Sequence, residues 1–286
     1  MGYTALGPMI PPQRGPQSPE SLRSLIRQRR IVYGCGRLHL AHSPKRRERL
    51  LRSIIDGDIR RFDVAPAYGN GLCERALGQV LRAARQDVTV NTKAGIPVGI
   101  YPAMSDVSFP LFRMADRLSG ASARAYGRRD FRPDTLRNSL EESLRRLQIL
   151  QVDTFFLHEP MVPFSCIEWD AIVETMSRLR EAGKLRAWGL AGPTHLYGLE
   201  RLRCDASLIV QLPFRELDDV SMPPFVQARL AFGTFSAFRA ARTGPTFVGF
   251  LEHAANVYQD TSFIVSSIDS TRLGCWLGDP HAEFRL

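Results

Sequence analysis

The sequence predicts a (β/α)8 barrel, in which eight parallel strands alternate with helices around one closed sheet. Short apolar segments of strand type alternate with segments of helical spacing over about 250 residues, the usual length of this fold. With 286 residues and 44% hydrophobic content, the chain can bury a substantial core. A doubly wound sheet is the alternative, but Gly34-Cys35-Gly36 lacks the third glycine of the dinucleotide-binding fingerprint. The barrel is therefore preferred.

The expected strands are short runs rich in β-branched and aromatic residues, bounded by glycine, proline or polar residues. The first, Ile31–Gly36, ends in a glycine-rich loop, and the second, Ile59–Val64, carries Asp63 at its end. The others are expected over Val88–Thr92, Val152–Leu157, Leu185–Leu190, Ser207–Gln211, a segment that finishes near Phe232-Gly233, and Ser262–Val265.

Apolar residues three and four positions apart predict the helices between these strands. Leu136, Leu140 and Leu144 form one such face, and Gly183 is a natural C-terminal cap for the helix that carries Trp169. The remaining helices are expected at Glu20–Gln28, Leu50–Gly57, Glu74–Ala84, near His195–Leu202, over Thr246–Tyr258 and over Asp269–Leu277, with a helix end within Phe225–Leu230.

Two parts of the chain are expected to lie outside this regular pattern. Residues 1–29 are rich in proline and contain no apolar signal-peptide core, so we expect a flexible N-terminal extension before a barrel domain at 30–286. The segment Ala94–Phe131, a long loop after the third strand, exceeds an ordinary connection in length. Loops of this length usually form lids or binding walls.

The net charge of +9 comes from small basic groups and not from one basic stripe. Most groups fall where solvated helix faces or loops are expected, and aromatic residues do not alternate with them. We therefore expect no nucleic-acid partner, and expect the charge to attract anionic small molecules such as a phosphate-bearing cofactor. The groups are Lys45-Arg46-Arg47, Arg60-Arg61, Arg128-Arg129 and Arg145-Arg146.

The patterns of cysteine, histidine and apolar residues bound the compartment and the metal content. No run of eighteen apolar residues is present, so no membrane span is expected. The scattered cysteines form no CxxC pair and the histidines show no ligand spacing, which argues against a zinc site. An odd number of dispersed cysteines suits a reducing compartment, so we expect a cytoplasmic protein. The cysteines are Cys35, Cys73, Cys166, Cys204 and Cys275.

Four candidate functional residues stand at or just past the ends of three predicted strands. Asp63 and Tyr68 belong to one Pro/Gly/Asn-rich stretch, Lys93 follows the third strand, and His158 follows the fourth. In a barrel all carboxyl ends open on the same face, so these residues are expected to converge. A surface tyrosine, a surface lysine or a structural histidine would each explain one of them, but not their convergence.

Together these groups suit proton transfer to or from a carbonyl oxygen. A phenol with its ordinary pKa of about 10 is a poor acid or base near neutrality, but a nearby ammonium lowers that pKa by stabilising the tyrosinate. An aspartate holds the lysine charged and in place, and a histidine can orient the substrate oxygen by a hydrogen bond. None of these groups is a reductant, so the electrons must come from a cofactor.

Taken with further blocks in the same order, these residues resemble the aldo-keto reductase family. The resemblance implies a (β/α)8-barrel oxidoreductase that binds NADPH or NADH and interconverts an aldehyde or ketone with the corresponding alcohol by hydride transfer. It covers residues 30–275 and rests on Asp63-Val64-Ala65-Pro66-Ala67-Tyr68-Gly69-Asn70-Gly71 with Glu74 and Leu77-Gly78, on Asn91-Thr92-Lys93, Ser139–Leu147 and Val152–His158, and on Gly183–Gly189 and Gln211–Phe214.

The resemblance also implies roles for the four candidate residues. Tyr68 matches the general acid/base of the family, and Lys93 and Asp63 match the pair that tunes it. His158 matches the residue that orients the substrate. The implied partner is a small-molecule carbonyl or alcohol substrate, with no metal, nucleic acid or membrane involved.

The same resemblance implies a set of cofactor-binding residues. Gln211 matches a residue that holds the nicotinamide carboxamide. Phe232 falls where an aromatic ring commonly stacks on the nicotinamide, and a core phenylalanine at a strand end is the alternative interpretation. Ser266 and Ser267 lie in the cofactor-phosphate block, where backbone amides at a helix start suit phosphate. Arg272 would pair with an adenosine 2′-phosphate, which favours NADPH, or would be a solvated helix arginine.

Some positions depart from the family pattern. Ala191-Gly192 stands where a Ser-Asn pair usually contacts the carboxamide, and Ser266-Ser267 stands where glycine and alanine are common. The first departure gives weight to an alternative function, a cofactor-binding regulatory or accessory protein with the barrel fold and little turnover. A nucleic-acid-binding protein, suggested by charge alone, is a weaker alternative and would show steeply salt-dependent retention of DNA or RNA.

Overall fold

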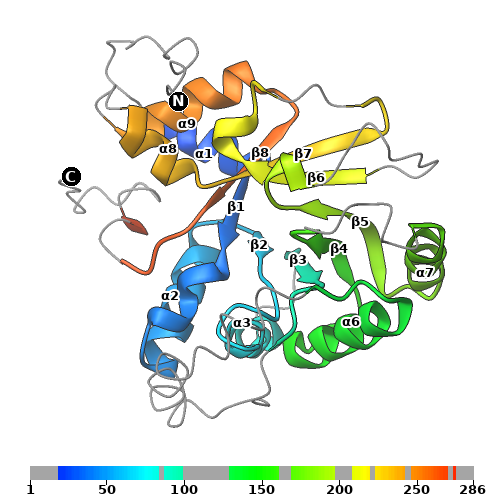
Figure 1. Cartoon of the computed structure of the whole chain (residues 1–286). Helices are drawn as coiled ribbons and strands as arrows, with labels where there is room; N and C mark the ends of the chain where they lie inside the picture. The colour runs from blue at the N-terminus through cyan, green and yellow to red at the C-terminus, as the bar shows by residue number, and fades with distance from the viewer. Residues whose placement is uncertain are drawn as a thin grey trace, which may run out of the picture.

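Eight parallel strands close into a barrel, with β8 pairing back onto β1 (Figure 1). This computed structural model describes residues 19–83, 87–98, 129–160, 169–196, 208–219, 223–241, 246–269 and 273–274. Each strand pairs in parallel with its neighbours in the sequence, as expected when a crossover segment returns the chain to the same end of the sheet. The predicted (β/α)8 barrel is confirmed.

The strands lie close to the predicted runs, with one exception. We predicted a helix end within Phe225–Leu230, and this was wrong. The Val226 N–H donates to Pro223 O at 2.9 Å, which closes one turn, and from Val226 onward the chain pairs with β6 instead of winding further. The strands are β1 Ile31–Gly34, β2 Arg61–Asp63, β3 Thr89–Ala94, β4 Val152–His158, β5 Leu185–Ala191, β6 Leu208–Pro213, β7 Val226–Phe232 and β8 Thr261–Val265.

Most helices begin or end at the residues that the sequence indicates. Pro44 occupies the first turn of its helix, the Thr246 side chain caps another by accepting from Gly249 N–H, and Gly183 takes a left-handed φ of 68° after a third. The helix at Thr234–Ala241 was not predicted. The α-helices are α1 Pro19–Arg27, α2 Pro44–Asp56, α3 Leu72–Ala83, α6 Pro133–Leu147, α7 Trp169–Glu181, α8 Thr234–Ala241 and α9 Phe247–Val257, and the 3-10 helices are η1 Cys35–Leu40, η3 Thr194–Leu196 and η5 Phe214–Glu216.

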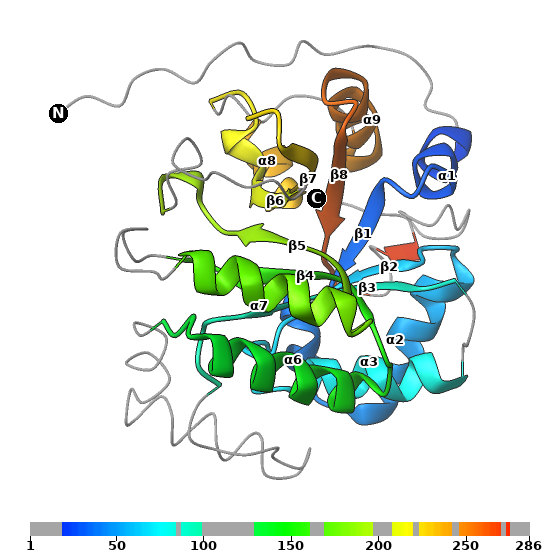
Figure 2. The same cartoon turned by 90° about the vertical axis from the view of Figure 1, so that its right-hand side faces the viewer.

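Strand residues alternate between two cores. In β4, Phe155 and Leu157 face the outer core between strands and helices, whereas Phe156 faces the barrel interior. Figures 1 and 2 show α2, α3, α6 and α7 around one side of the barrel and α1, α8 and α9 on the opposite side. The interior cluster consists of Val32, Phe156, Ala191, Leu230 and Ile264.

The helix predicted at Glu20–Gln28 is present as α1, and it is part of the packed structure. Its Leu22, Leu25 and Ile26 are buried in the outer core, and the helix contacts α9. Residues 1–18 lie outside the described residues, so the division into an extension at 1–29 and a barrel at 30–286 stays a prediction.

The segment Ala94–Phe131 lies largely outside the described residues, which omit 99–128, but its two ends meet. The Asp130 N–H donates to Gly95 O at 2.9 Å. Gly95 has a φ of 108°, and a Cβ there would stand 1.9 Å from the Phe131 ring, so both conformation and space require glycine. The base of the predicted loop is therefore closed beside β3.

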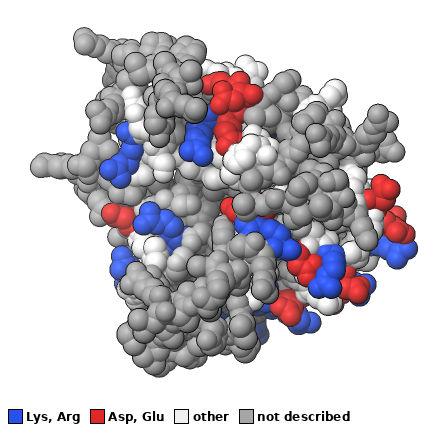
Figure 3. All heavy atoms as spheres, viewed as in Figure 1, with Lys and Arg blue, Asp and Glu red and all other residues white. Residues whose placement is uncertain are grey.

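Many of the described surface charges form pairs of opposite sign. Examples are Arg178 with Glu174 and Arg137 with Asp134, and Figure 3 shows blue and red side chains next to one another on the face in view. Across the described ranges, no helix has both the length and the apolar character needed to cross a membrane. The same residues contain no group of three or more His, Cys, Asp or Glu that could hold a metal ion.

Candidate active site

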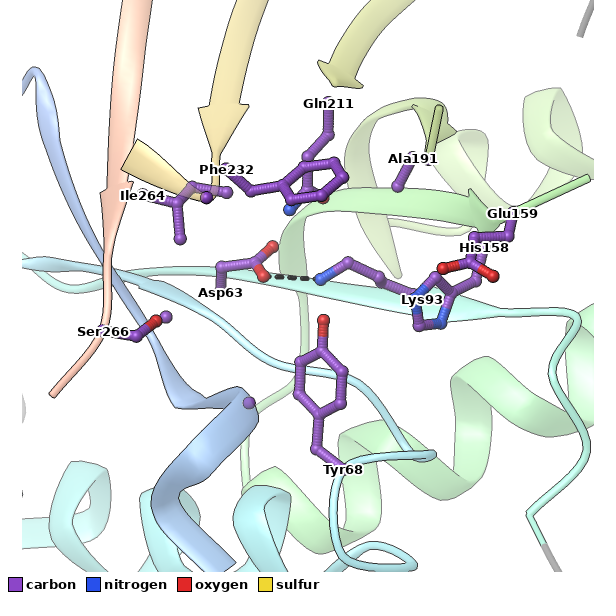
Figure 4. Close-up of a pocket in the computed structure, with 14 residues that line it drawn as sticks. Asp63, Tyr68, Lys93, His158, Glu159, Ala191, Gln211, Phe232, Ile264 and Ser266 are labelled. Carbon is purple, nitrogen blue, oxygen red and sulfur yellow. Dashed lines mark hydrogen bonds and ion pairs between the residues drawn. The ribbon is translucent and has the colours of Figure 1, made fainter. Parts of the chain in front are cut away.

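A cavity of about 220 Å³ opens at the carboxyl ends of the strands. Asp63, Tyr68, Lys93 and His158 all line it, so the structure brings the four candidate residues together as predicted (Figure 4). Every strand contributes to the lining: from β1 to β8 these residues are Gly34, Asp63, Lys93, His158, Ala191, Gln211, Phe232 and Ile264.

Tyr68 is presented by a tight turn between β2 and α3. Gly69, Asn70 and Gly71 have φ values of 62°, 52° and 80°, a run of left-handed residues that glycine and asparagine tolerate best. The Gly71 N–H closes the turn by donating to Pro66 O at 2.7 Å. The Pro-Ala-Tyr-Gly-Asn-Gly stretch thus folds back on itself, and the Tyr68 hydroxyl points toward Asp63 and Lys93 (Figure 4).

Lys93 and Asp63 form a buried ion pair close to Tyr68. Lys93 Nζ lies 2.6 Å from Asp63 Oδ2 and donates a second hydrogen bond to Val64 O at 3.2 Å. The side chains are only 1% and 3% exposed. The ammonium stands 5.1 Å from the centroid of the Tyr68 ring. A positive charge is therefore held next to the phenol with almost no access to water.

His158 ends β4 and is also buried. Its ring meets the Tyr68 ring edge to face, with centroids 6.0 Å apart. Burial lowers the pKa of His158 well below its ordinary value, and the positive charges of Lys93 and Arg129 lower it further. The imidazole is therefore neutral near pH 7, with one nitrogen able to donate and the other able to accept a hydrogen bond.

The predicted cofactor residues reach the cavity to different extents. Gln211, Phe232 and Ser266 line it. Gln211 Oε1 is buried and, within the described part of the chain, has no hydrogen-bond partner. Ser267 does not line the cavity; its hydroxyl accepts from Asp269 N–H at 3.1 Å, and its carbonyl accepts from Tyr33 at 2.5 Å. Arg272 lies outside the described residues.

Several lining residues were not predicted as site residues, and among them are Glu159 and Gly192. Glu159 follows His158 directly and has a φ of 46°, an uncommon conformation for a residue other than glycine. The available signal was an acidic residue between a strand-end histidine and a proline. Gly192 was noticed only as a departure from the family pattern.

The model of the Aldo/keto reductase family matches residues 30–212. A D-threo-aldose 1-dehydrogenase from Pseudomonas sp. is 29% identical over 159 residues, which make up 54% of this chain and 46% of that protein. An NADH-specific methylglyoxal reductase from Escherichia coli (strain K12) is 29% identical over 162 residues, 56% of this chain and 45% of that protein. The match thus spans about half the length of these curated relatives.

Solved structures show the same fold. An aldo/keto reductase from Klebsiella pneumoniae in complex with NADP and acetate superposes with a TM-score of 0.56 at 18% identity, covering 87% of this chain and 84% of that chain. The closed barrel and the titratable side chains gathered at its carboxyl end define the class, a (β/α)8-barrel protein with a cavity at the strand ends. Because the family model covers more than half of the sequence, the chain belongs to the aldo/keto reductase family, which comprises NAD(P)-dependent oxidoreductases.

Proposed function

We propose that this protein is an oxidoreductase that interconverts a small aldehyde or ketone and the corresponding alcohol, with NADPH or NADH as the redox partner. One observation carries the proposal: a phenol, a buried ammonium-carboxylate pair and a neutral imidazole meet in one cavity. These are the groups needed to move a proton at a carbonyl oxygen.

Tyr68 acts as the general acid in the reducing direction and as the general base in the oxidising direction. In reduction, its hydroxyl gives a proton to the carbonyl oxygen as negative charge develops there. Lys93, next to the ring, stabilises the phenolate that remains, and Asp63 holds Lys93 in position. His158, being neutral, donates a hydrogen bond to the same oxygen and orients it. In oxidation, each proton moves in reverse.

A bound nicotinamide would supply or accept the hydride that none of these side chains can provide. The chain has groups that fit it. The buried, unsatisfied Gln211 Oε1 can accept a hydrogen bond from the carboxamide NH2, and Phe232 offers an aromatic face. Ser266 lies at the end of β8, where the phosphates would bind, with Ser267 shaping that turn. Arg272 is proposed to pair with a 2′-phosphate.

The comparisons support a nicotinamide cofactor but do not distinguish NADPH from NADH. The structure from Klebsiella pneumoniae contains NADP, whereas the Escherichia coli relative is named as NADH-specific. The named substrates of the two curated relatives are an aldose and methylglyoxal, both small carbonyl compounds. We propose NADPH as the preferred cofactor, a small carbonyl or alcohol substrate, and a cytoplasmic location.

The test follows NADPH absorbance with a panel of aldehydes and ketones, and NADP+ reduction with the corresponding alcohols. Tyr68→Phe should lower kcat by about 100-fold or more, since general acid-base catalysis contributes that much, and should leave cofactor affinity unchanged. Tyr258→Phe is the matched control, because it removes a phenol hydroxyl that bonds Asp218 and does not line the cavity.

Two other outcomes have distinct meanings. Cofactor binding without turnover in either direction would favour the regulatory or accessory alternative, to which the departure from the family pattern at Ala191-Gly192 gives weight. Failure to bind either nicotinamide cofactor would overturn the proposal.

A further inference from the structure

Glu159 holds a strained conformation at the wall of the cavity. Its φ of 46° places a non-glycine residue in the left-handed region, which costs about 1 kcal/mol or more and persists where the surroundings impose it. The Glu159 N–H donates to Ala191 O at 2.6 Å, so the chain turns sharply after β4 and stays against β5. This turn holds Glu159 at the wall of the cavity.

Arg129 fixes the carboxylate of Glu159. Arg129 Nη2 lies 2.9 Å from Glu159 Oε2, and Arg129 Nε donates to the Glu159 carbonyl at 3.0 Å. The Arg129 side chain is 2% exposed, whereas that of Glu159 is 24% exposed. The guanidinium is therefore buried, and Glu159 is the member of the pair that is partly exposed and lines the cavity.

Gly192 makes room for this arrangement. A Cβ at residue 192 would lie 3.0 Å from Glu159 Cγ and 3.1 Å from Glu159 Cα, and Gly192 has a φ of 148°. Any larger residue would press on Glu159. The glycine is thus coupled to the position of the acid, and the space that a side chain at 192 would use is filled by Glu159.

We propose that Glu159, positioned by Arg129 and Gly192, determines substrate specificity by accepting a hydrogen bond from a hydroxyl group next to the reacting carbonyl. The proposal rests on the proposed function. Figure 4 shows Glu159 on the same side of the view as His158, with Ile264 and Ser266 on the opposite side, so the acid belongs to the end of the cavity where His158 would orient a carbonyl.

The acceptor oxygens of Glu159 define the substrate class. A carboxylate has acceptor positions on both oxygens, so it can bind Arg129 and a ligand hydroxyl together. The preferred substrate is therefore a hydroxyaldehyde or hydroxyketone, and not a simple alkyl aldehyde.

Binding without cofactor tests this proposal independently of turnover. Dissociation constants for glyceraldehyde and for propanal, which lacks both hydroxyl groups, are measured by saturation-transfer NMR. The native protein should bind glyceraldehyde about tenfold tighter, as a hydrogen bond to a charged group allows. Glu159→Gln, which keeps the size and an acceptor for Arg129, should lose most of this preference. Gly192→Ala, which displaces Glu159, should reduce it too.

Glu174→Gln is the matched control, because it neutralises the acid of a surface Glu–Arg pair on α7. It should keep the native preference. Equal binding of the two aldehydes by the native protein, or an unchanged preference in a folded Glu159→Gln, would overturn the proposal. Neither result would contradict the proposed function, which is tested separately by the NADPH assay with Tyr68→Phe.

Discussion

At the scale of single residues, the buried Lys93–Asp63 pair is the most costly feature of the site. Taking two charges out of water carries a penalty of several kcal/mol per ion, which their mutual attraction repays only with good geometry. Here the contact is 2.6 Å, and Lys93 has a second acceptor in Val64 O. Asp63 Oδ1 is buried and has no hydrogen-bond partner among the described residues. The Lys93–Asp63 pair is therefore better explained by a chemical role next to Tyr68 than by a contribution to folding stability.

A double-mutant cycle checks this energetic argument. Asp63→Asn and Lys93→Met should each lower the free energy of unfolding by about 3–5 kcal/mol, because each leaves one buried charge unpaired. The double variant should lose much less than the sum, since neither charge remains. Urea unfolding measures all four proteins. Additive losses would show that the two charges do not support each other.

His158 makes stability depend on pH. Its folded pKa lies below the unfolded value of about 6.5 because burial disfavours the cation, with Lys93 and Arg129 adding to the effect. The contribution of His158 to stability is therefore complete above about pH 6.5 and is lost as the pH falls, because only the unfolded chain takes up the proton.

The expected slope is up to about 1.4 kcal/mol per pH unit below that point. Urea unfolding from pH 7.5 to pH 5.0 should show a steeper loss for the native protein than for His158→Gln, which cannot be protonated. Parallel curves for the two proteins would mean that His158 titrates equally in both states.

At the scale of elements, one buried acid joins three of them. Glu74 in α3 accepts from Thr92 Oγ1 of β3 at 2.7 Å and from Arg146 Nε of α6 at 2.6 Å. Thr92 immediately precedes Lys93, and α3 follows the turn that carries Tyr68. This network therefore fixes β3 and α3, the two elements that set the distance between the ammonium and the phenol.

Close packing of α3 on α6 depends on Gly78. Helix propensity alone predicts that Gly78→Ala stabilises by about 1 kcal/mol. A Cβ there would lie 2.5 Å from Arg146 O and 2.7 Å from Leu147 O, which are backbone atoms that cannot move away easily. We expect a net loss of about 1–3 kcal/mol in urea unfolding. Gln79→Ala, at the exposed neighbouring position, should change little; a stabilised Gly78→Ala would refute the close contact.

At the scale of the whole molecule, the barrel closes only when β8 reaches β1, and α1 packs beside that junction. Ile31, Val32 and Tyr33 pair with Phe263, Ile264 and Val265. The Arg30 guanidinium, next to α1, donates to the carbonyls of Ala255, Tyr258 and Thr261. The residues that follow α1 are thus joined to α9 and β8, and α1 itself contacts α9, so we expect these elements to unfold together.

Leu25→Ala tests that cooperativity. Leu25 is buried in the outer core, so its truncation should lower the free energy of unfolding by about 2–5 kcal/mol. The loss should appear as one transition at lower urea concentration with an unchanged slope, because the whole barrel is affected. A native transition with a small separate phase would mean that α1 unfolds independently.

Much of this protein follows from local patterns. The alternation of strand and helix signals predicts the barrel, because parallel strands need helical crossovers and a closed sheet buries both faces. Since the carboxyl ends of all strands then share one face, the sequence alone predicted that Asp63, Lys93 and His158 lie close together. The glycines beside Tyr68 likewise predicted the turn that carries it. Short signals were weaker: Phe225–Leu230 was misread as a helix end, and the eight residues of α8 were missed.

Other features were decided only by tertiary structure. The sequence by itself determined the fold and which side chains meet at the cavity, because hydrophobic periodicity and strand ends are local properties. It did not reveal that Arg129 pairs with Glu159 or that Gly192 leaves space for that acid. It also did not reveal that Gln211 Oε1 has no hydrogen-bond partner among the described residues. These depend on contacts between segments remote in sequence, and a distance between side chains exists only once the barrel has closed.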